Sequence, residues 1–224
     1  MNNTYVPPIL TVDSVIFQLV ANELSVLLIK RTTEPFREQW ALPGGYSVFG
    51  ETTRDAMSRI LEDKTGLKAK DLPLIEQLYT FETVARDPHG HAVSVTYMGL
   101  GKDLKLWSSK TAQNPKFFPI SKLPKLAYDH ADIIHYAHER LSSKVTYTNA
   151  VFALLPKFFT LTHLQSAYET ILGRKLDKRN FRKKFLSLGM VKPSDRYYQD
   201  GAHRPALLYS FQQQKLQVLS RSFD

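Results

Sequence analysis

The fold of this chain is indicated by residues 40–67, which read WALPGGYSVFGETTRDAMSRILEDKTGL. Within this stretch, residues 52–65 carry apolar side chains at helical spacing, and Gly66 follows as a helix stop. Two β-rich runs, residues 9–20 and 24–30, precede the stretch with the short gap of a hairpin. This order predicts strands, a glycine loop and an amphipathic helix that pack as one α+β unit.

The remaining elements predict two domains. Further strands are expected at residues 77–82, 92–100 and 116–120. A helix over residues 128–143 is the expected connector. We place the boundary after Lys144, so that residues 1–144 form an α+β sandwich and residues 145–224 form a second domain.

The second domain has the order of a winged helix-turn-helix. Helices are expected at residues 147–155, 162–172 and 177–188, and a hairpin at residues 197–198 and 206–211. Thr162 with Gln165 fits the spacing of a capping box, and Asp177 is a good N-cap for the third helix. Three helices and a hairpin predict a winged helix.

The composition is that of a globular protein without disulfides. Of the 224 residues, 43% are hydrophobic, 23% are charged and none is cysteine, which excludes disorder as the main state. No run approaches the roughly 18 consecutive apolar residues of a bilayer span, and the N-terminus lacks the pattern of an export signal. We therefore expect a cytoplasmic protein with no membrane partner.

The net charge of +9 lies almost entirely in the second domain. Residues 1–144 hold 17 basic and 16 acidic side chains, whereas residues 145–224 hold 13 basic and 5 acidic ones. This asymmetry predicts an anionic partner for the second domain. Nucleic acid is the first candidate and an anionic membrane surface the second.

Six residues of the opening stretch carry a family resemblance. They are Gly45, Glu51, Arg59, Leu61, Gly66 and Leu67. Their spacing matches the pattern G-x(5)-E-x(7)-R-E-U-x-E-E-x-G-U, in which U is aliphatic, so the first domain resembles the Nudix superfamily. The resemblance implies a Nudix α/β/α sandwich and, for the enzymes of the family, a divalent metal held largely by three glutamates.

At those three glutamate positions this sequence has Ile60, Asp63 and Lys64. One carboxylate remains of three, and Mg²⁺ needs anionic oxygen ligands, whereas a lysine ammonium repels it. Glu62 is off the pattern by one residue, about 100° round the helix. We therefore predict a non-enzymatic Nudix domain with no catalytic residues, no metal and no required cofactor. The histidines also show no spacing that gathers three of them on one face.

A pocket without metal can still bind a nucleotide diphosphate as an effector. Arginine forms bidentate hydrogen bonds with phosphate oxygens, and an aromatic ring stacks on adenine. The candidate effector-binding residues are Lys30, Arg37, Trp40, Gly44, Gly45 and Arg86, with Arg31 and Phe36 as further candidates.

The helix expected at residues 177–188 has a cationic face. Phe181, Phe185 and Leu188 form its buried stripe, which leaves Arg179 and Lys183 on the opposite face. Arginine and lysine read guanine edges and phosphates, and asparagine reads adenine, so this face is suited to duplex DNA. The candidate DNA-binding residues are Lys178, Arg179, Asn180, Arg182, Lys183 and Arg204, with Arg196 and His203 as further contacts from the hairpin.

A degenerate Nudix domain followed by a basic winged helix resembles the Nudix-related transcriptional regulators of bacterial NAD metabolism. Residues 86–95 and 176–184 add to this resemblance. It implies a homodimeric repressor that binds palindromic operator DNA of NAD biosynthesis or salvage genes. It also implies a response to ADP-ribose or a related nucleotide.

Two other functions stay open. An active ADP-ribose or sugar-nucleotide pyrophosphohydrolase would use Glu51, Glu62 and Asp63 as metal ligands and carry the basic domain as an accessory. Metal-dependent turnover would identify it. A winged helix that binds RNA or another protein would instead fail to bind duplex DNA.

Overall fold

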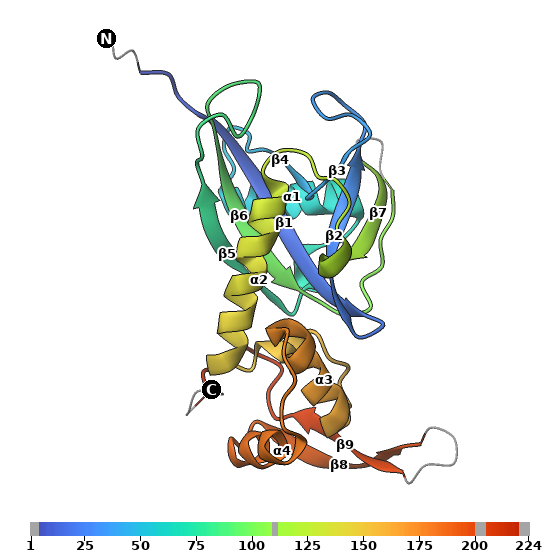
Figure 1. Cartoon of the computed structure of the whole chain (residues 1–224). Helices are drawn as coiled ribbons and strands as arrows, with labels where there is room; N and C mark the ends of the chain where they lie inside the picture. The colour runs from blue at the N-terminus through green and yellow to red at the C-terminus, as the bar shows by residue number, and fades with distance from the viewer. Residues whose placement is uncertain (1–4, 109–111, 200–204, 220–224) are drawn as a thin grey trace.

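The computed structural model describes residues 5–108, 112–199 and 205–219, which form a sandwich domain and a smaller helical domain below it (Figure 1). The sandwich contains β1 (Ile9–Val20), β2 (Glu23–Arg31), β3 (Trp40–Ala41), β4 (Gly44–Tyr46), α1 (Thr53–Thr65), η1 (Ala69–Asp71), β5 (Leu74–Phe81), β6 (Ala92–Leu100), β7 (Ala112–Pro119) and η2 (Ile120–Lys122). The chain continues through α2 (His130–Tyr147), η3 (Ala150–Ala153), α3 (Leu161–Leu172), α4 (Lys178–Ser187), β8 (Val191–Tyr198) and β9 (Ala206–Phe211). None of the helices in the described part combines the length and apolar character that a membrane span requires.

The sandwich is built on one mixed sheet. Its strand order is β3-β2-β1-β6-β5, with β4 paired to β1 and β7 paired to β2. Strand β1 runs antiparallel to β2 and parallel to β6. The hairpin predicted between the first two strands is confirmed, because Ala21 and Asn22 both adopt positive φ in a two-residue turn.

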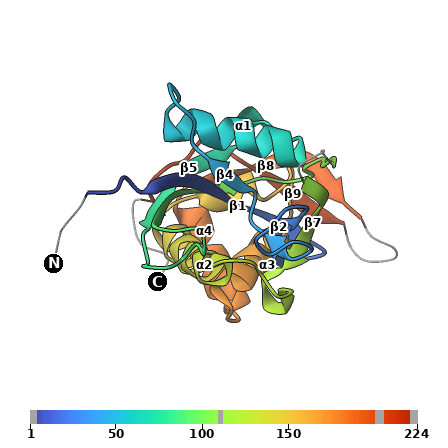
Figure 2. The ribbon, with the colours of Figure 1, turned by 90° about the horizontal axis from the view of Figure 1, so that it is seen from above.

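Two helices cover opposite faces of this sheet, as the view from above shows (Figure 2). Alternation along β1 separates the faces, since Val12 and Ile16 pack in the cluster that contains α1 residues. Val15 and Phe17 pack in the cluster that contains α2 residues. The predicted α/β/α sandwich therefore describes the first domain.

Helix α1 begins and ends where the sequence predicts. Thr52 is its N-cap and forms a reciprocal capping box with Asp55. Gly66 ends it in the left-handed region at φ 77°, and a Cβ at this position would overlap the Trp107 ring. The stretch that carries the family motif therefore folds as a loop followed by a helix.

Helix α2 joins the two domains. It starts two residues later than the predicted 128–143, because Tyr128 adopts a positive φ of 52°, and it ends four residues later, at Tyr147. Lys144, the predicted boundary, thus lies inside its last turn. Its second half contacts α3, where His138 Nε2 and Ser142 Oγ each lie 2.9 Å from the carbonyl oxygen of Ile171.

Two local predictions for the second domain are wrong. Residues 147–155 do not form one helix, because Thr148 is extended and bridges Val218, which leaves only η3 before Pro156. Thr162 does not cap α3, because Thr160 does so, accepting a hydrogen bond from the backbone N–H of His163.

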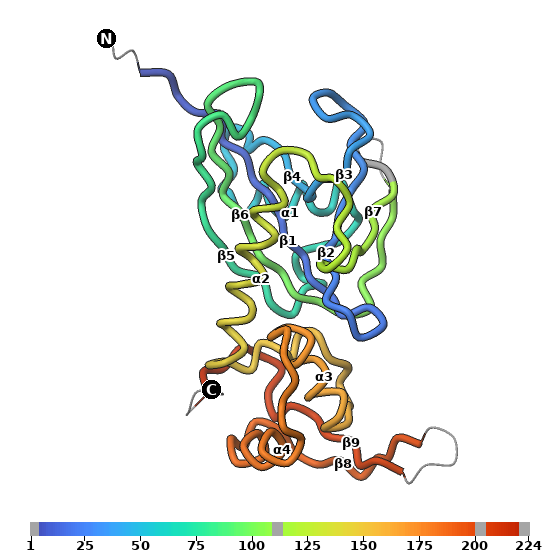
Figure 3. Tube along the Cα trace, in the orientation of Figure 1, coloured from blue at the N-terminus to red at the C-terminus, as the bar shows by residue number. Residues whose placement is uncertain are grey.

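The end of the described chain returns to the end of α2, as the tube trace shows (Figure 3). The backbone N–H of Leu219 donates to the carbonyl of Tyr147, and Asn149 bonds to Gln217. One hydrophobic cluster also runs from β1 through α2 to α3, α4 and β9. The helical domain is therefore packed against the sandwich and not merely tethered to it.

Candidate functional site

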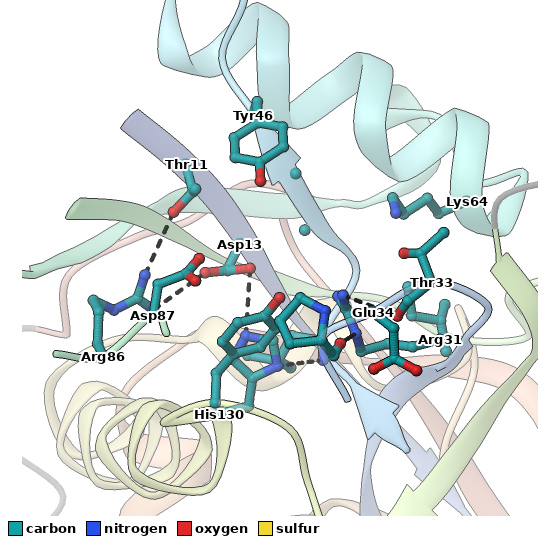
Figure 4. Close-up of a pocket in the computed structure, with 16 residues that line it drawn as sticks. Thr11, Asp13, Arg31, Thr33, Glu34, Tyr46, Lys64, Arg86, Asp87 and His130 are labelled. Atoms are coloured by element: carbon teal, nitrogen blue, oxygen red, sulfur yellow. Dashed lines mark hydrogen bonds and ion pairs between the residues drawn. The ribbon is translucent and has the colours of Figure 1, made fainter. Parts of the chain in front are cut away.

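A cavity of about 300 Å³ opens between the sheet, α1 and the start of α2. Figure 4 shows the side chains that line it. The lining residues are Thr11, Asp13, Ile29, Arg31, Thr33, Glu34, Pro35, Leu42, Gly44, Gly45, Tyr46, Lys64, Arg86, Asp87, Tyr128 and His130.

Asp13 is a buried carboxylate in the middle of strand β1, where it is 5% exposed. The hydroxyl of Ser94 donates to it at 2.6 Å from the neighbouring strand β6. Gly44 lies opposite Asp13 in the pairing of β1 with β4, and a Cβ on Gly44 would overlap the Asp13 carboxylate. The glycine loop therefore makes room for a buried acid in the cavity wall.

Arg86 connects the cavity to the residue that precedes α2. Its guanidinium donates twice to Asp129, at 2.9 and 2.8 Å, and lies 3.6 Å from Asp13. Burial alone would lower the pKa of Arg86, but the hydrogen bonds it donates to Asp129 and the charge of Asp13 raise this pKa overall. Arg86 is thus a permanent cation held between two carboxylates.

His130 is the first residue of α2 and is fully enclosed. Its Nδ1 accepts a hydrogen bond of 2.9 Å from the backbone N–H of Leu42. That bond requires an unprotonated Nδ1, so the ring is neutral with its proton on Nε2, which faces Asp13 at 3.6 Å. Burial lowers the pKa of His130 more than Asp13 raises it.

We expect the free energy of unfolding to decrease as the pH falls below about 6.5, the ordinary histidine pKa. In the unfolded chain this histidine takes up a proton there, whereas folded His130 resists protonation. Since the unfolded state binds more protons, the stability is present above about pH 6.5 and is lost toward the lower folded pKa.

Thermal melts from about pH 7.5 to about 5.5 test this. A His130→Asn variant should melt at a lower temperature at the upper pH and show a shallower pH dependence. His135→Asn, on the exposed side of α2, is the matched control and should follow the parent chain. Equal slopes for the parent and the His130 variant would contradict this assignment.

Two basic side chains of the cavity have no carboxylate partner among the described residues. Arg31 donates to the carbonyl oxygens of Pro35 and Thr33 and lies 5.0 Å from the centre of the Tyr128 ring. Lys64 makes no hydrogen bond or ion pair with any residue that the structure describes. Burial, followed by the charge of Arg31, lowers the pKa of Lys64.

The metal-binding positions of the family motif do not form a metal site in this chain. Ile60 is 3% exposed within the core under α1, and Asp63 lies on the exposed side of the helix. Glu51 is held by Arg59, at 2.6 and 3.0 Å, and accepts from the backbone N–H of Val48. These bonds lower the pKa of Glu51 and fix the loop to the helix.

The other acidic residues do not replace the missing metal ligands. Glu62, the off-pattern glutamate, pairs with Lys68 at 3.1 Å. No group of three histidine or acidic side chains that could hold a metal ion occurs in the described ranges. The residues present therefore do not fit a divalent metal.

The cavity includes only some of the candidate effector residues. Gly44, Gly45 and Arg86 line it, but Lys30, Arg37 and Trp40 do not. Successive side chains of a strand point to opposite faces, so Arg31 faces the cavity while Lys30 pairs with Glu38 outside it. Trp40 is the cross-strand neighbour of Lys30 and packs edge-on against Phe118.

Twelve of the 16 lining residues were not among the effector candidates. They include Asp13, Tyr46, Lys64, Tyr128 and His130. The sequence signal for this set was Asp13, an acidic residue inside the apolar run of β1. His130, which the sequence did not single out, is buried in the core.

Helix α4 presents the cationic face that the sequence predicts. Asp177 caps it through the backbone N–H of Asn180, and Phe181 and Phe185 are buried against Tyr168 of α3. The residues exposed on its outer side include Lys178, Arg179, Asn180 and Lys183.

The other two candidates for DNA contact lie differently. Arg182 is half-buried and donates to the Thr162 hydroxyl at 3.1 Å, so it links α4 to α3. Arg204, with His203, lies outside the described residues. Of the hairpin residues, Arg196 lies over the Phe158 ring at 4.4 Å.

Comparison with protein families assigns both parts of the chain. The NUDIX domain profile matches residues 10–137. The profile of the NrtR DNA-binding winged helix domain matches residues 151–211.

Individual relatives extend this match over nearly the whole chain. It is 37% identical over 214 residues, 92% of this chain and 83% of the relative, to the ADPR responsive transcriptional repressor NtrR of Acinetobacter baylyi. It is 36% identical over 133 residues, 58% of this chain and 73% of the relative, to an ADP-ribose pyrophosphatase of Methanocaldococcus jannaschii.

Solved structures show the same arrangement. Shewanella oneidensis NrtR complexed with a 27mer DNA superposes with a TM-score of 0.78 at 30% identity, covering 96% of this chain and 99% of that one. The NUDIX domain of the same protein complexed with ADP ribose superposes with a TM-score of 0.56 at 34% identity, covering 61% of this chain and 90% of that one.

Proposed function

Since the chain belongs to the Nudix family and, within it, to the NrtR-type regulators that carry a winged helix DNA-binding domain, we propose that it is a transcriptional repressor released from DNA by ADP-ribose. One observation carries the proposal. A Nudix cavity whose metal positions are occupied by Ile60 and Lys64 is joined by a single helix to a winged helix with an exposed basic face. Such a cavity suits a receptor, because a sensor must bind its effector without consuming it.

The proposal includes finer assignments. We place the effector against Gly44, Gly45, Arg31, Lys64 and Arg86 in the cavity. The DNA contacts are proposed for Lys178, Arg179, Asn180 and Lys183 on α4. A cytoplasmic homodimer would place two such helices on the half-sites of a palindromic operator near genes of NAD biosynthesis or salvage.

Footprinting on the upstream region of such genes tests this function. The chain should protect a palindromic site on duplex DNA, and ADP-ribose should remove the protection. RNA or protein binding without any duplex footprint would support the other class of winged helix and contradict the proposal.

The identity to an ADP-ribose pyrophosphatase makes hydrolysis the second candidate function. The described residues argue against it, because one exposed carboxylate, Asp63, cannot supply the ligand set of Mg²⁺. Without a metal there is no Lewis acid to polarise the pyrophosphate and no activated water.

We therefore expect no ADP-ribose turnover above the buffer rate with Mg²⁺ or Mn²⁺. Release of AMP and ribose 5-phosphate, followed by chromatography, measures this directly. An Asp63→Ala variant serves as the internal reference for trace contaminants. Turnover by the parent chain that disappears in the Asp63 variant would establish the enzyme instead.

A further inference from the structure

Lys64 is the cavity residue whose chemistry is least explained by the fold. It lies in the last turn of α1 at a position where the family motif has a metal-binding glutamate. Figure 4 shows it extending from α1 on the side of the cavity where Arg31 and Thr33 lie. The ammonium has three N–H donors, and none of them forms a hydrogen bond to a described residue.

The cations of the cavity differ in how far they are neutralised. Arg86 is paired with Asp129 and Asp13, so a ligand has to compete with these two carboxylates for its guanidinium. Arg31 and Lys64 have no carboxylate partner among the described residues. Glu34 lines the same end of the cavity, but it is exposed and forms no ion pair with either of them.

An unpaired, half-buried cation beside a second one costs free energy in the empty protein. A ligand that carries two adjacent negative charges removes this cost, because each phosphate oxygen accepts hydrogen bonds from the ammonium and the guanidinium. In a Nudix enzyme the divalent metal neutralises the same charges.

We propose that Lys64 takes the place of the divalent cation and binds the pyrophosphate oxygens of the effector, with Arg31, so that nucleotide recognition requires no metal. The inference rests on the proposed function, since it assigns a residue to the effector site of that function. Lys64 thus takes away one metal ligand and supplies a charge that keeps the diphosphate bound. A lysine offers no open coordination position for water, so the diphosphate is held but not attacked.

Titration calorimetry with ADP-ribose tests the proposal on the full chain, once with EDTA and once with Mg²⁺. The parent chain should bind equally well in both. Lys64→Met should bind about 10- to 100-fold more weakly, the range expected for losing a hydrogen bond to a charged group. Lys64→Arg should recover much of that loss, because it restores a cation in the same place.

Lys68→Met is the matched control. It makes the same chemical change near the same helix, outside the cavity, and should bind like the parent chain. All variants should bind operator DNA without nucleotide as the parent does, which shows that the fold is intact.

The outcomes distinguish the role of Lys64 from the proposed function of the chain. Binding by the parent chain that needs Mg²⁺, or undiminished binding by Lys64→Met, overturns the role of Lys64 and leaves the regulator intact. Absence of any ADP-ribose binding by the parent chain would instead refute the proposed effector, and the role of Lys64 with it.

Discussion

Replacement of both Arg179 and Lys183 by alanine is expected to reduce operator affinity by about 1000-fold. Each contact of this kind contributes about 1 kcal/mol or more, and the proposed dimer on two half-sites would lose four of them. The total of about 4 kcal/mol corresponds to three factors of ten. Both side chains are exposed and make no interaction with other described residues, so the stability should change by less than about 0.5 kcal/mol.

Fluorescence anisotropy of labelled operator DNA at several salt concentrations measures the effect. If each winged helix of the dimer contacts about three phosphates, log K should fall against log salt with a slope of about −5. The slope should become shallower by about 0.9 for each phosphate contact that is lost. A residue that reads a base edge should change the discrimination between operator sequences more than the slope.

Lys70→Ala is the control, because it removes one exposed charge from the sandwich domain, away from α4. It should bind operator DNA like the parent chain. Unchanged affinity of the Arg179 and Lys183 double variant, or a salt slope near zero, would show that α4 does not dock on DNA.

The elements that the sequence predicted well are those governed by local signals. Helix α1 has a capping box at Thr52 and a glycine stop at Gly66, and α4 has Asp177 as its cap and a phenylalanine stripe. The predicted helix at residues 147–155 failed because Thr148 pairs with Val218, a neighbour 70 positions away that no local pattern reveals.

The lining of the cavity was predicted less completely, for a geometric reason. Basic residues at the end of β2 were predicted to meet the effector, and the pleat places Arg31 in the cavity and Lys30 outside it. In a strand, an error of one residue places a side chain on the opposite face of the sheet. His130 meets Leu42 and Asp13 only through the packing of α2 on the sheet, and sequence spacing carries no trace of such a contact.

A second functional consequence is expected from the contact between Arg86 and Asp129. These residues join the cavity to the first turn of α2, whose 18 residues span about 27 Å. At its other end α2 bonds to α3 through His138 and Ser142. We expect a diphosphate near Arg86 to compete with Asp129 for the guanidinium, and so to change the anchoring of α2 and the position of the winged helix.

We expect ADP-ribose to lower operator affinity 5- to 150-fold, equivalent to about 1 to 3 kcal/mol of coupling. A small rotation is sufficient, because the two recognition helices of a dimer must stay about 34 Å apart, one turn of DNA. By linkage, operator DNA must weaken ADP-ribose binding by the same factor. Calorimetric titration of ADP-ribose with and without operator DNA therefore measures the same coupling, as the effect of DNA on ADP-ribose affinity.

Asp129→Asn is the variant that separates coupling from binding. It keeps the shape of the side chain and removes a charge that holds Arg86. Arg86→Ala would instead leave buried Asp13 and half-buried Asp129 without their cation, at a cost of about 3 to 5 kcal/mol. The asparagine variant should still bind operator DNA alone and ADP-ribose alone. ADP-ribose should no longer weaken its DNA binding, so that the coupling factor falls toward one. If the parent chain binds ADP-ribose equally well with and without operator DNA, the nucleotide has no differential affinity for the two states and cannot be the signal.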